Sequence, residues 1–300
     1  MLFNSFHFLL FFPIVTAIYF IIPHKYRWLW LLLASCSFYM FFKAVYILIL
    51  FFTIIIDYFA GIYIEQAGKM IDKKRLLLVS IIANVLVLAI FKYFNFLNDN
   101  VTGILSWAGY RNPIPALSIL LPIGLSFHTF QAMSYTIEVY RGNQKAERKF
   151  GIYALYVMFF PQLVAGPIER PQNMLPQFYE RHIFNPVDVA EGLKRILIGL
   201  FKKVVVADRL AIYVNSVYGN YEQHGSLSLI TATIFFSIQI YCDFSGYSGI
   251  AIGTARVLGF RLMENFNRPY FAKSISEFWS KWHISLSTWF KDYVYIPLGG

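Results

Sequence analysis

The side chains best suited to chemistry lie together near the end of the chain, in residues 277–300. His283 stands here among three tryptophans, Trp279, Trp282 and Trp289. An imidazole can take up and release a proton near neutral pH. No metal-ligating side chain follows His283 at a spacing of three or four residues, so the pattern does not indicate a metal site. The chemistry left open is general-base or hydrogen-bond catalysis by His283.

Two functions fit that histidine from the residues alone. The chain holds no G-x-S-x-G motif, no P-loop and no dinucleotide-binding glycine motif. Acyl transfer to a hydroxyl group suits an imidazole that works without a covalent nucleophile, and proton-coupled transport suits it equally. A lone histidine more often has a structural role, but a water-filled site inside a membrane protein favours a functional one.

We expect one continuous helix to hold the histidine. Ser274 and Glu277 form the S-x-x-E pattern of a capping box, and Pro297 marks the end of the helix. The residues that would share the face of His283 are Trp279, Leu286 and Phe290. A second, polar face would carry Lys281, Ser285, Thr288 and Asp292.

The composition places the chain in a membrane. Of its 300 residues, 58% are hydrophobic and 14% are charged, whereas soluble domains carry about 25% charged residues. The net charge of +10 does not indicate nucleic-acid binding, because the basic residues fall in short runs between apolar segments. Cys36 and Cys242 lie in apolar stretches without a metal-binding or disulfide pattern. We therefore expect a single multi-pass membrane domain over residues 1–300, with no nucleic acid and no metal.

Five apolar segments approach the roughly 20 residues that a membrane helix needs. They cover residues 6–22, 28–42, 45–64, 76–91 and 117–137, and a sixth long segment covers 227–253. The first has no basic leader and no cleavage site, so we expect a retained span. Three basic loops, at residues 24–27, 65–75 and 140–149, then fall on one side. The positive-inside rule places these loops in the cytoplasm and the N-terminus outside.

A polar stripe runs along the fifth segment. His128, Gln131, Tyr135 and Glu138 recur at helical spacing on an otherwise apolar helix. Lipid cannot satisfy such side chains, so they must face a cavity or one another. A cavity wall and helix-to-helix hydrogen bonding remain equally open.

The chain is less regular after this point. Residues 159–171 hold three prolines and a glycine, which predicts a broken or re-entrant element with Glu169 and Arg170 at its polar end. Asn185, Pro186 and Asp188 then mark the start of a basic amphipathic helix. Such a helix is typical of the membrane interface. Its lysines suit anionic lipid headgroups best, and the phosphates of a nucleotide-bearing donor are the alternative.

Asp243 is an ionisable residue inside the last long apolar segment. It shares a helix face with Gln239 and Tyr247. An acid at membrane depth is a candidate functional residue, and the alternative is a structural ion pair with Arg256 or Arg268. Gly249 and Gly253, further along the same segment, form a GxxxG pattern that favours close helix contact.

Several long motifs, taken together, resemble the membrane-bound O-acyltransferase family, in its bacterial alginate O-acetyltransferase-like branch. The motifs are LPIGLSFHTFQAMSYTIEVYRG (121–142), FFPQLVAGPIERP (159–171), IQIYCDFSGYSGIAIG (238–253) and NFNRPYFAKSISEFWSKWHISLSTWFKDYVYIPLGG (265–300). The resemblance implies an all-α, polytopic membrane protein whose helices surround a tunnel, with broken, re-entrant and interfacial helices. It also implies an enzyme that passes an acetyl group from a cytoplasmic thioester, such as acetyl-CoA, toward hydroxyls of an exported polysaccharide or peptidoglycan.

The resemblance assigns roles to residues already singled out. His283 fills the FW-x-x-WH motif and is the expected catalytic residue, while a second family histidine lies further downstream than Gly300. We therefore expect a chain truncated within the family pattern. The resemblance also implies a protein of the bacterial inner membrane that works with periplasmic acetyltransferase partners. It implies no tightly bound cofactor. The residues expected to line the tunnel are Trp279, Trp282, Asp243, Tyr247, His128, Gln131 and Glu138. A polysaccharide or lipid transporter, or an inactive fragment, is the alternative.

Overall fold

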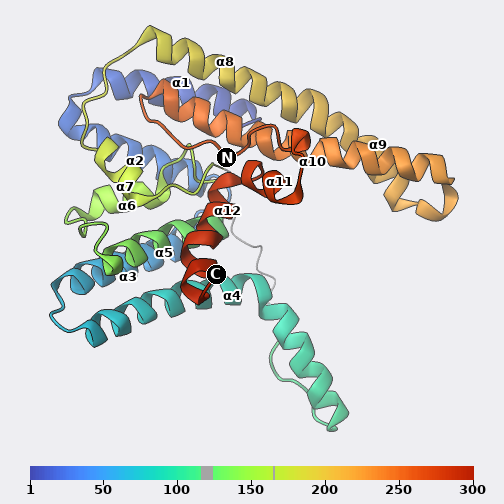
Figure 1. The fold of residues 1–300 in the computed structure, drawn as a ribbon, viewed down its shortest axis with the longest axis horizontal. Coiled ribbons are helices and arrows are strands. Elements are labelled where there is room, and N and C mark those ends of the chain that lie inside the picture. Colours follow the sequence, from blue (N-terminus) through green and yellow to red (C-terminus); the bar gives the residue numbers. More distant parts are fainter. Residues whose placement is uncertain (116–123, 165) are drawn as a thin grey trace.

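The computed structural model describes residues 1–115, 124–164 and 166–300, and this part of the chain is helical with no β-strand. Figure 1 shows the helices side by side around a central region, with the C-terminal helices crossing it. The α-helices are α1 Phe6–Ile21, α2 His24–Met40, α3 Tyr46–Gln66, α4 Met70–Trp107, α5 Leu125–Arg141, α6 Phe150–Met158, α7 Pro171–Gln177, α8 Pro186–Leu200, α9 Asp208–Gly219, α10 Ser226–Val257, α11 Ile275–Lys281 and α12 Ile284–Phe290. Two π-helices, η1 Phe201–Ala207 and η4 Lys291–Tyr295, continue α8 and α12.

The short helix α6 lies at the centre of the core. Every residue from Ile152 to Phe160 is at most 2% exposed, and α6 packs against α2, α3 and α5. A helix that is apolar on all sides must be surrounded by protein. Nine residues are too few to cross a bilayer. The predicted broken element follows directly, because the described residues between Phe159 and Arg170 form turns and irregular backbone up to the start of α7.

Three described helices, α3, α4 and α10, are long and apolar enough to cross a membrane, and α1 is a shorter apolar helix. The expected bounds of the first three spans agree with α1, α2 and α3 within a few residues. The fourth span was predicted to end at residue 91, which is wrong, because α4 continues to Trp107. The start of the fifth predicted span, residues 117–123, lies outside the described residues, and α5 begins at Leu125.

The three basic loops lie at one end of the molecule, at the left of Figure 1. Arg148 pairs with Glu65 and so links the loop after α5 to the end of α3. Arg27, in the first turn of α2, donates a hydrogen bond to the carbonyl oxygen of His182, which brings the start of α2 to the segment before α8. The predicted grouping of these loops on one side is therefore the arrangement in the fold.

Helices α8 and α10 form a long antiparallel pair along the top of Figure 1. Glycines allow the two backbones to meet. A Cβ atom on Gly192 would lie 2.7 Å from the carbonyl oxygen of Gly253, and one on Gly199 would lie 2.7 Å from that of Gly246. Gly249 has ordinary room, with its nearest neighbour at 3.8 Å. The GxxxG pattern therefore contributes one of its two glycines to the closest contact, and the other comes from Gly246.

The expectation of one continuous helix around His283 is wrong. Helix α11 ends at Lys281, and α12 starts at Ile284. His283 lies between them with φ 44° and ψ 56°, a left-handed conformation. The predicted apolar and polar faces across residues 279–292 consequently do not exist as single stripes. The cap at the start was predicted correctly, since the Ser274 side chain accepts a hydrogen bond from the amide of Glu277.

Candidate functional site

A backbone pairing places His283 in its turn. The segment 265–267 runs antiparallel to residues 281–284, with an isolated β-bridge between Phe266 and Trp282. The amide of Asn267 donates to the carbonyl oxygen of Lys281 at 3.0 Å, and the amide of Ile284 donates to that of Asn265 at 2.9 Å. A left-handed conformation is uncommon for a residue other than glycine and needs support from its surroundings. These two bonds bracket His283 and supply that support.

Asn265 reinforces the same turn through its side chain. Its Oδ1 atom accepts hydrogen bonds from the Ser285 amide at 3.2 Å and from the Ser285 hydroxyl at 2.8 Å. Asn265 is 1% exposed and Ser285 is fully buried. A buried hydrogen bond is costly to break, because the partner left behind has no water to replace it. Asn265 is therefore a positioning residue for His283.

The imidazole of His283 is enclosed by phenyl rings. Its centroid lies 4.5 Å from that of Phe244, 6.0 Å from that of Phe127 and 6.3 Å from that of Phe266. The residue is 8% exposed, and its Nε2 atom has no hydrogen-bond partner within the described residues. Burial lowers the pKa of His283 to about 4. The ring is consequently neutral near pH 7, with a nitrogen available to accept a proton or a hydrogen bond.

The three neighbouring tryptophans have other roles than enclosing this ring. Trp279 is 54% exposed. Trp282 packs on Phe266 with centroids 5.2 Å apart, and so supports the bridge beside His283. Trp289 is buried, and its indole nitrogen donates to the carbonyl oxygen of Phe130 at 2.9 Å and to the Ser134 hydroxyl at 2.8 Å. The aromatic surroundings predicted for His283 therefore come from phenylalanines in other segments.

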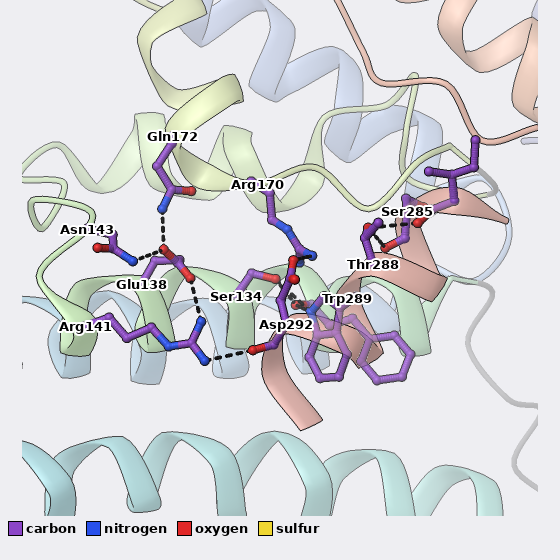
Figure 2. A network of polar contacts seen from close by, with 12 residues as sticks. Ser134, Glu138, Arg141, Asn143, Arg170, Gln172, Ser285, Thr288, Trp289 and Asp292 are labelled. Atoms are coloured by element: carbon purple, nitrogen blue, oxygen red, sulfur yellow. Dashed lines mark hydrogen bonds and ion pairs between the residues drawn. The ribbon is translucent and has the colours of Figure 1, made fainter. Parts of the chain in front are cut away.

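A polar network ties the C-terminal helices to α5, as Figure 2 shows. Asp292 pairs with Arg170 at 2.9 Å, and its carbonyl oxygen accepts a hydrogen bond from Arg141 at 2.9 Å. Glu138 pairs with Arg141 at 3.3 Å and accepts a hydrogen bond from Gln172. The network lines a cavity of about 410 Å³. It fixes the segment after His283 against α5 and against the broken segment before α7.

The polar stripe on α5 mostly makes contacts within the protein. His128 contacts the carbonyl oxygen of Val157 through Nδ1 at 3.1 Å. Gln131 donates to the carbonyl oxygen of Tyr156. The third member, Tyr135, accepts a hydrogen bond from the amide of Glu147 at 2.9 Å. These contacts correspond to the interpretation as hydrogen bonding between helices, whereas Glu138 lies at the cavity of Figure 2.

Asp243 forms an ion pair, but with a different partner from either one considered above. Its carboxylate lies 2.6 Å from the Lys203 ammonium group, whereas Arg256 pairs with Asp188 at 3.3 Å. Tyr247, one turn further along α10, donates a hydrogen bond to Asn4 at 3.0 Å. Both residues therefore link α10 to neighbouring segments.

One buried acid and one cavity escaped the sequence analysis. Asp57 is fully buried in α3, where it accepts hydrogen bonds from Ser80 at 2.6 Å and from Asn84 at 2.9 Å. An acid inside an apolar segment was the available signal. Lys202 lines a cavity of about 120 Å³ between α8 and α10, together with Asn265. Only the fold brings these two residues together, so no sequence signal could have found the cavity.

No group of three or more histidine, cysteine, aspartate or glutamate side chains in the described ranges could hold a metal ion. The described rings that surround His283 are those of Phe127, Phe244 and Phe266.

Comparisons with known proteins show which proteins this chain is similar to. The chain is 41% identical, over all of its length, to a probable alginate O-acetylase of Pseudomonas aeruginosa, of which it covers 58%. It is 38% identical to a peptidoglycan O-acetyltransferase of Helicobacter pylori over 91% of this chain and 56% of that protein. A teichoic acid D-alanyltransferase of Bacillus subtilis is 27% identical over 61% of this chain and 47% of its own length.

The chain thus spans somewhat more than half the length of the first two of these relatives. The model of the membrane-bound O-acyltransferase (MBOAT) family matches residues 150–300, which include α6, the α8 and α10 pair and the His283 turn. This all-α, polytopic membrane protein belongs to the MBOAT family.

Proposed function

We propose that the full-length protein is a membrane O-acyltransferase, which passes an acetyl group from a cytoplasmic thioester donor toward hydroxyls of an exported polysaccharide. The observation that carries this proposal is His283, a buried, neutral histidine with a free Nε2 atom in a chain of this family. The relatives are named for acetyl or D-alanyl transfer to alginate, peptidoglycan or teichoic acid.

The proposed step is direct transfer to a hydroxyl group. The Nε2 atom of His283 accepts the hydroxyl proton while the oxygen attacks the acyl carbon. A carbon–oxygen bond forms, the carbon–sulfur bond breaks, and the proton passes to the departing thiolate. A neutral imidazole is the form this step requires, and burial keeps His283 in that form near pH 7.

We propose positioning roles for the surrounding residues. Trp282 and Asn265 hold the turn, while His128 and Gln131 brace α5 against α6. The remaining residues expected at the tunnel are Trp279, Asp243, Tyr247 and Glu138. Trp279 is exposed, Asp243 and Tyr247 are half-buried, and Glu138 lines the cavity of Figure 2.

The setting of the reaction follows from the same reasoning. Acetyl-CoA or another acyl thioester supplies the acyl group, and the basic end of the molecule faces the cytoplasm with the N-terminus outside. The bacterial inner membrane holds the protein, and periplasmic acetyltransferase partners complete delivery to the polymer. An alginate-like exopolymer or peptidoglycan is the acceptor.

Reconstitution of the full-length protein in proteoliposomes, with its periplasmic acetyltransferase partners present, tests this function. Labelled acetyl thioester is supplied on one side and a hydroxylated polymer or oligosaccharide on the other. The acyltransferase forms a covalent, alkali-labile acetyl ester on the acceptor. A polysaccharide or lipid transporter would move the acceptor and leave it unlabelled, which would overturn the proposal.

A further inference from the structure

The cavity between α8 and α10 adjoins the aromatic surroundings of His283, because Phe266 lines both. Its volume is about 120 Å³, roughly the space of four water molecules. The side chains that matter for binding are Arg195, Lys202, Ser248 and Asn265. The cavity is therefore large enough for a small polyatomic ion and too small for a nucleotide or a sugar chain.

The two cations of this cavity differ in their partners. Arg195 is neutralised, because it makes a two-point ion pair with Glu264, one contact being 2.6 Å. Lys202 has only a long contact of 3.5 Å to the Ser245 hydroxyl and the ring of Tyr241 at 5.4 Å. Within the described ranges, no carboxylate lies in ion-pair distance of Lys202. Its positive charge is thus available to a ligand.

The neighbouring lysine shows the contrast. Lys203 lies between two carboxylates, Asp208 at 2.7 Å and Asp243 at 2.6 Å. Both lysines belong to the π-helix η1, where the wider turn replaces the regular spacing of an α-helix. Such π-turns are frequently found at functional sites. The local geometry therefore directs one lysine to acids and the other to the cavity.

Two neutral donors complete the lining. The Ser248 hydroxyl and the Asn265 Nδ2 group are buried, in residues 2% and 1% exposed, and neither has a partner among the described residues. The Oδ1 atom of Asn265 is already used by Ser285, so the Nδ2 group remains to serve the cavity. A buried donor without a partner costs free energy unless a ligand or water accepts its hydrogen bond.

We propose that this cavity binds a phosphate group, held by the charge of Lys202 and by hydrogen bonds from Ser248 and Asn265. A phosphate supplies several acceptor oxygens around one centre, which matches one lysine and two neutral donors. Its size matches the cavity. The group can belong to a phospholipid headgroup or to a soluble phosphate compound, since the chemistry of recognition is shared.

Binding here would act on the turn that holds His283. Asn265 uses its carbonyl oxygen to fix Ser285 and its amino group to line the cavity. An ion that orders the amino group also orders the carbonyl oxygen of the same side chain. The phosphate site would therefore stabilise the His283 turn without taking part in acyl transfer.

Thermal unfolding of the full-length protein in a phosphate-free, non-ionic detergent tests the site directly. Inorganic phosphate is titrated, and the dissociation constant is taken from the rise in Tm. The variant Lys202→Met should weaken phosphate binding at least about tenfold, because it removes a charge-assisted contact. Ser248→Ala should weaken phosphate binding several-fold, and it is the variant to compare if Lys202→Met does not fold. Lys194→Met removes an exposed lysine from the same helix and binds as the wild type does.

A second arm identifies the source of the group. Phosphatidylglycerol and a phosphate-free glycolipid are compared in the same detergent. A rise in Tm that phosphatidylglycerol gives and Lys202→Met abolishes identifies a lipid headgroup, whereas a response confined to inorganic phosphate identifies a soluble compound. The same response in Lys202→Met, Ser248→Ala and Lys194→Met, or no response in the wild type, would overturn the proposal. Neither readout depends on acyl transfer.

Discussion

At the scale of single residues, His283 combines three unusual properties. It adopts a left-handed backbone, it is buried, and its Nε2 atom has no partner among the described residues. Strained and incompletely satisfied groups tend to persist where function requires them. The structure supports the strain through Asn265, whose backbone and side chain both bind the residues after His283.

The neutral state of His283 predicts a pH dependence of stability. Burial lowers its pKa from 6.5 to about 4 in the folded protein, so the unfolded chain binds more protons between these values. The contribution of His283 to stability is complete above about pH 6.5 and is lost as the pH falls toward 4. We expect the Tm of the wild type to decrease more than the Tm of His283→Gln when the pH is lowered from about 7 to 5.

Thermal unfolding of both proteins in detergent at the two pH values measures this difference. His7→Gln, a substitution of an exposed histidine, is the control and follows the wild type. Equal losses of Tm in wild type and His283→Gln would show that the imidazole is not held neutral by burial.

At the scale of the elements, the α8 and α10 pair positions the cavity that Lys202 and Asn265 line. Gly192 and Gly199 on α8 oppose Gly253 and Gly246 on α10, and the spacing is seven residues on each helix. Seven residues are close to two turns, so both contacts fall on the same face. The close approach of the backbones brings η1 and its lysines to Ser245 and Asp243.

This close contact between α8 and α10 predicts different effects for two glycine substitutions. A Cβ atom on Gly199 would lie 2.7 Å from backbone and side-chain atoms of α10, whereas Gly249 has room for one. We expect Gly199→Ala to destabilise the protein by about 1–3 kcal/mol, the usual cost of overpacking. Gly249→Ala should be neutral or slightly stabilising, because alanine favours the helix. The Tm of each variant is measured in detergent. Equal values would contradict the close glycine contact between α8 and α10.

The sequence predicts those elements whose signals are local. Apolar runs bounded by charged loops gave the first three helices, and Asn185 and Ser274 were recognisable as caps. The end of α4 was missed because its asparagine-rich part suggests a loop, although it continues as a helix. The break at His283 has no glycine or proline to announce it. It results from pairing with residues 265–267, a long-range contact that propensity cannot reveal.

At the scale of the whole molecule, the fold has a basic end and an opposite end. The loops after α1, α3 and α5 all lie at the basic end, at the left of Figure 1. Helix α4 has 38 residues, whereas its neighbour α3 crosses with 21. At 1.5 Å per residue α4 is about 57 Å long, so it projects well beyond α3 on the opposite side.

The positive-inside rule turns this polarity into a prediction of sidedness. In a full-length variant without Cys36 and Cys242, Asn100→Cys on the far part of α4 should react with a membrane-impermeant maleimide added from the periplasm. Lys73→Cys and Lys145→Cys, at the basic end, should react only after the membrane is permeabilised. The reverse pattern would show that the basic loops face outward and that the N-terminus lies in the cytoplasm.

The central claim is that His283 is essential for acyl transfer by the full-length protein. The most direct measurement is acetylation of the acceptor in proteoliposomes by the wild type and His283→Ala, with amounts and folding matched by Tm. Loss of a general base predicts a fall of at least about 100-fold for His283→Ala. His7→Ala removes an exposed histidine away from the site, serves as the control and keeps most activity. Wild-type acetylation by a well-folded His283→Ala would contradict the account.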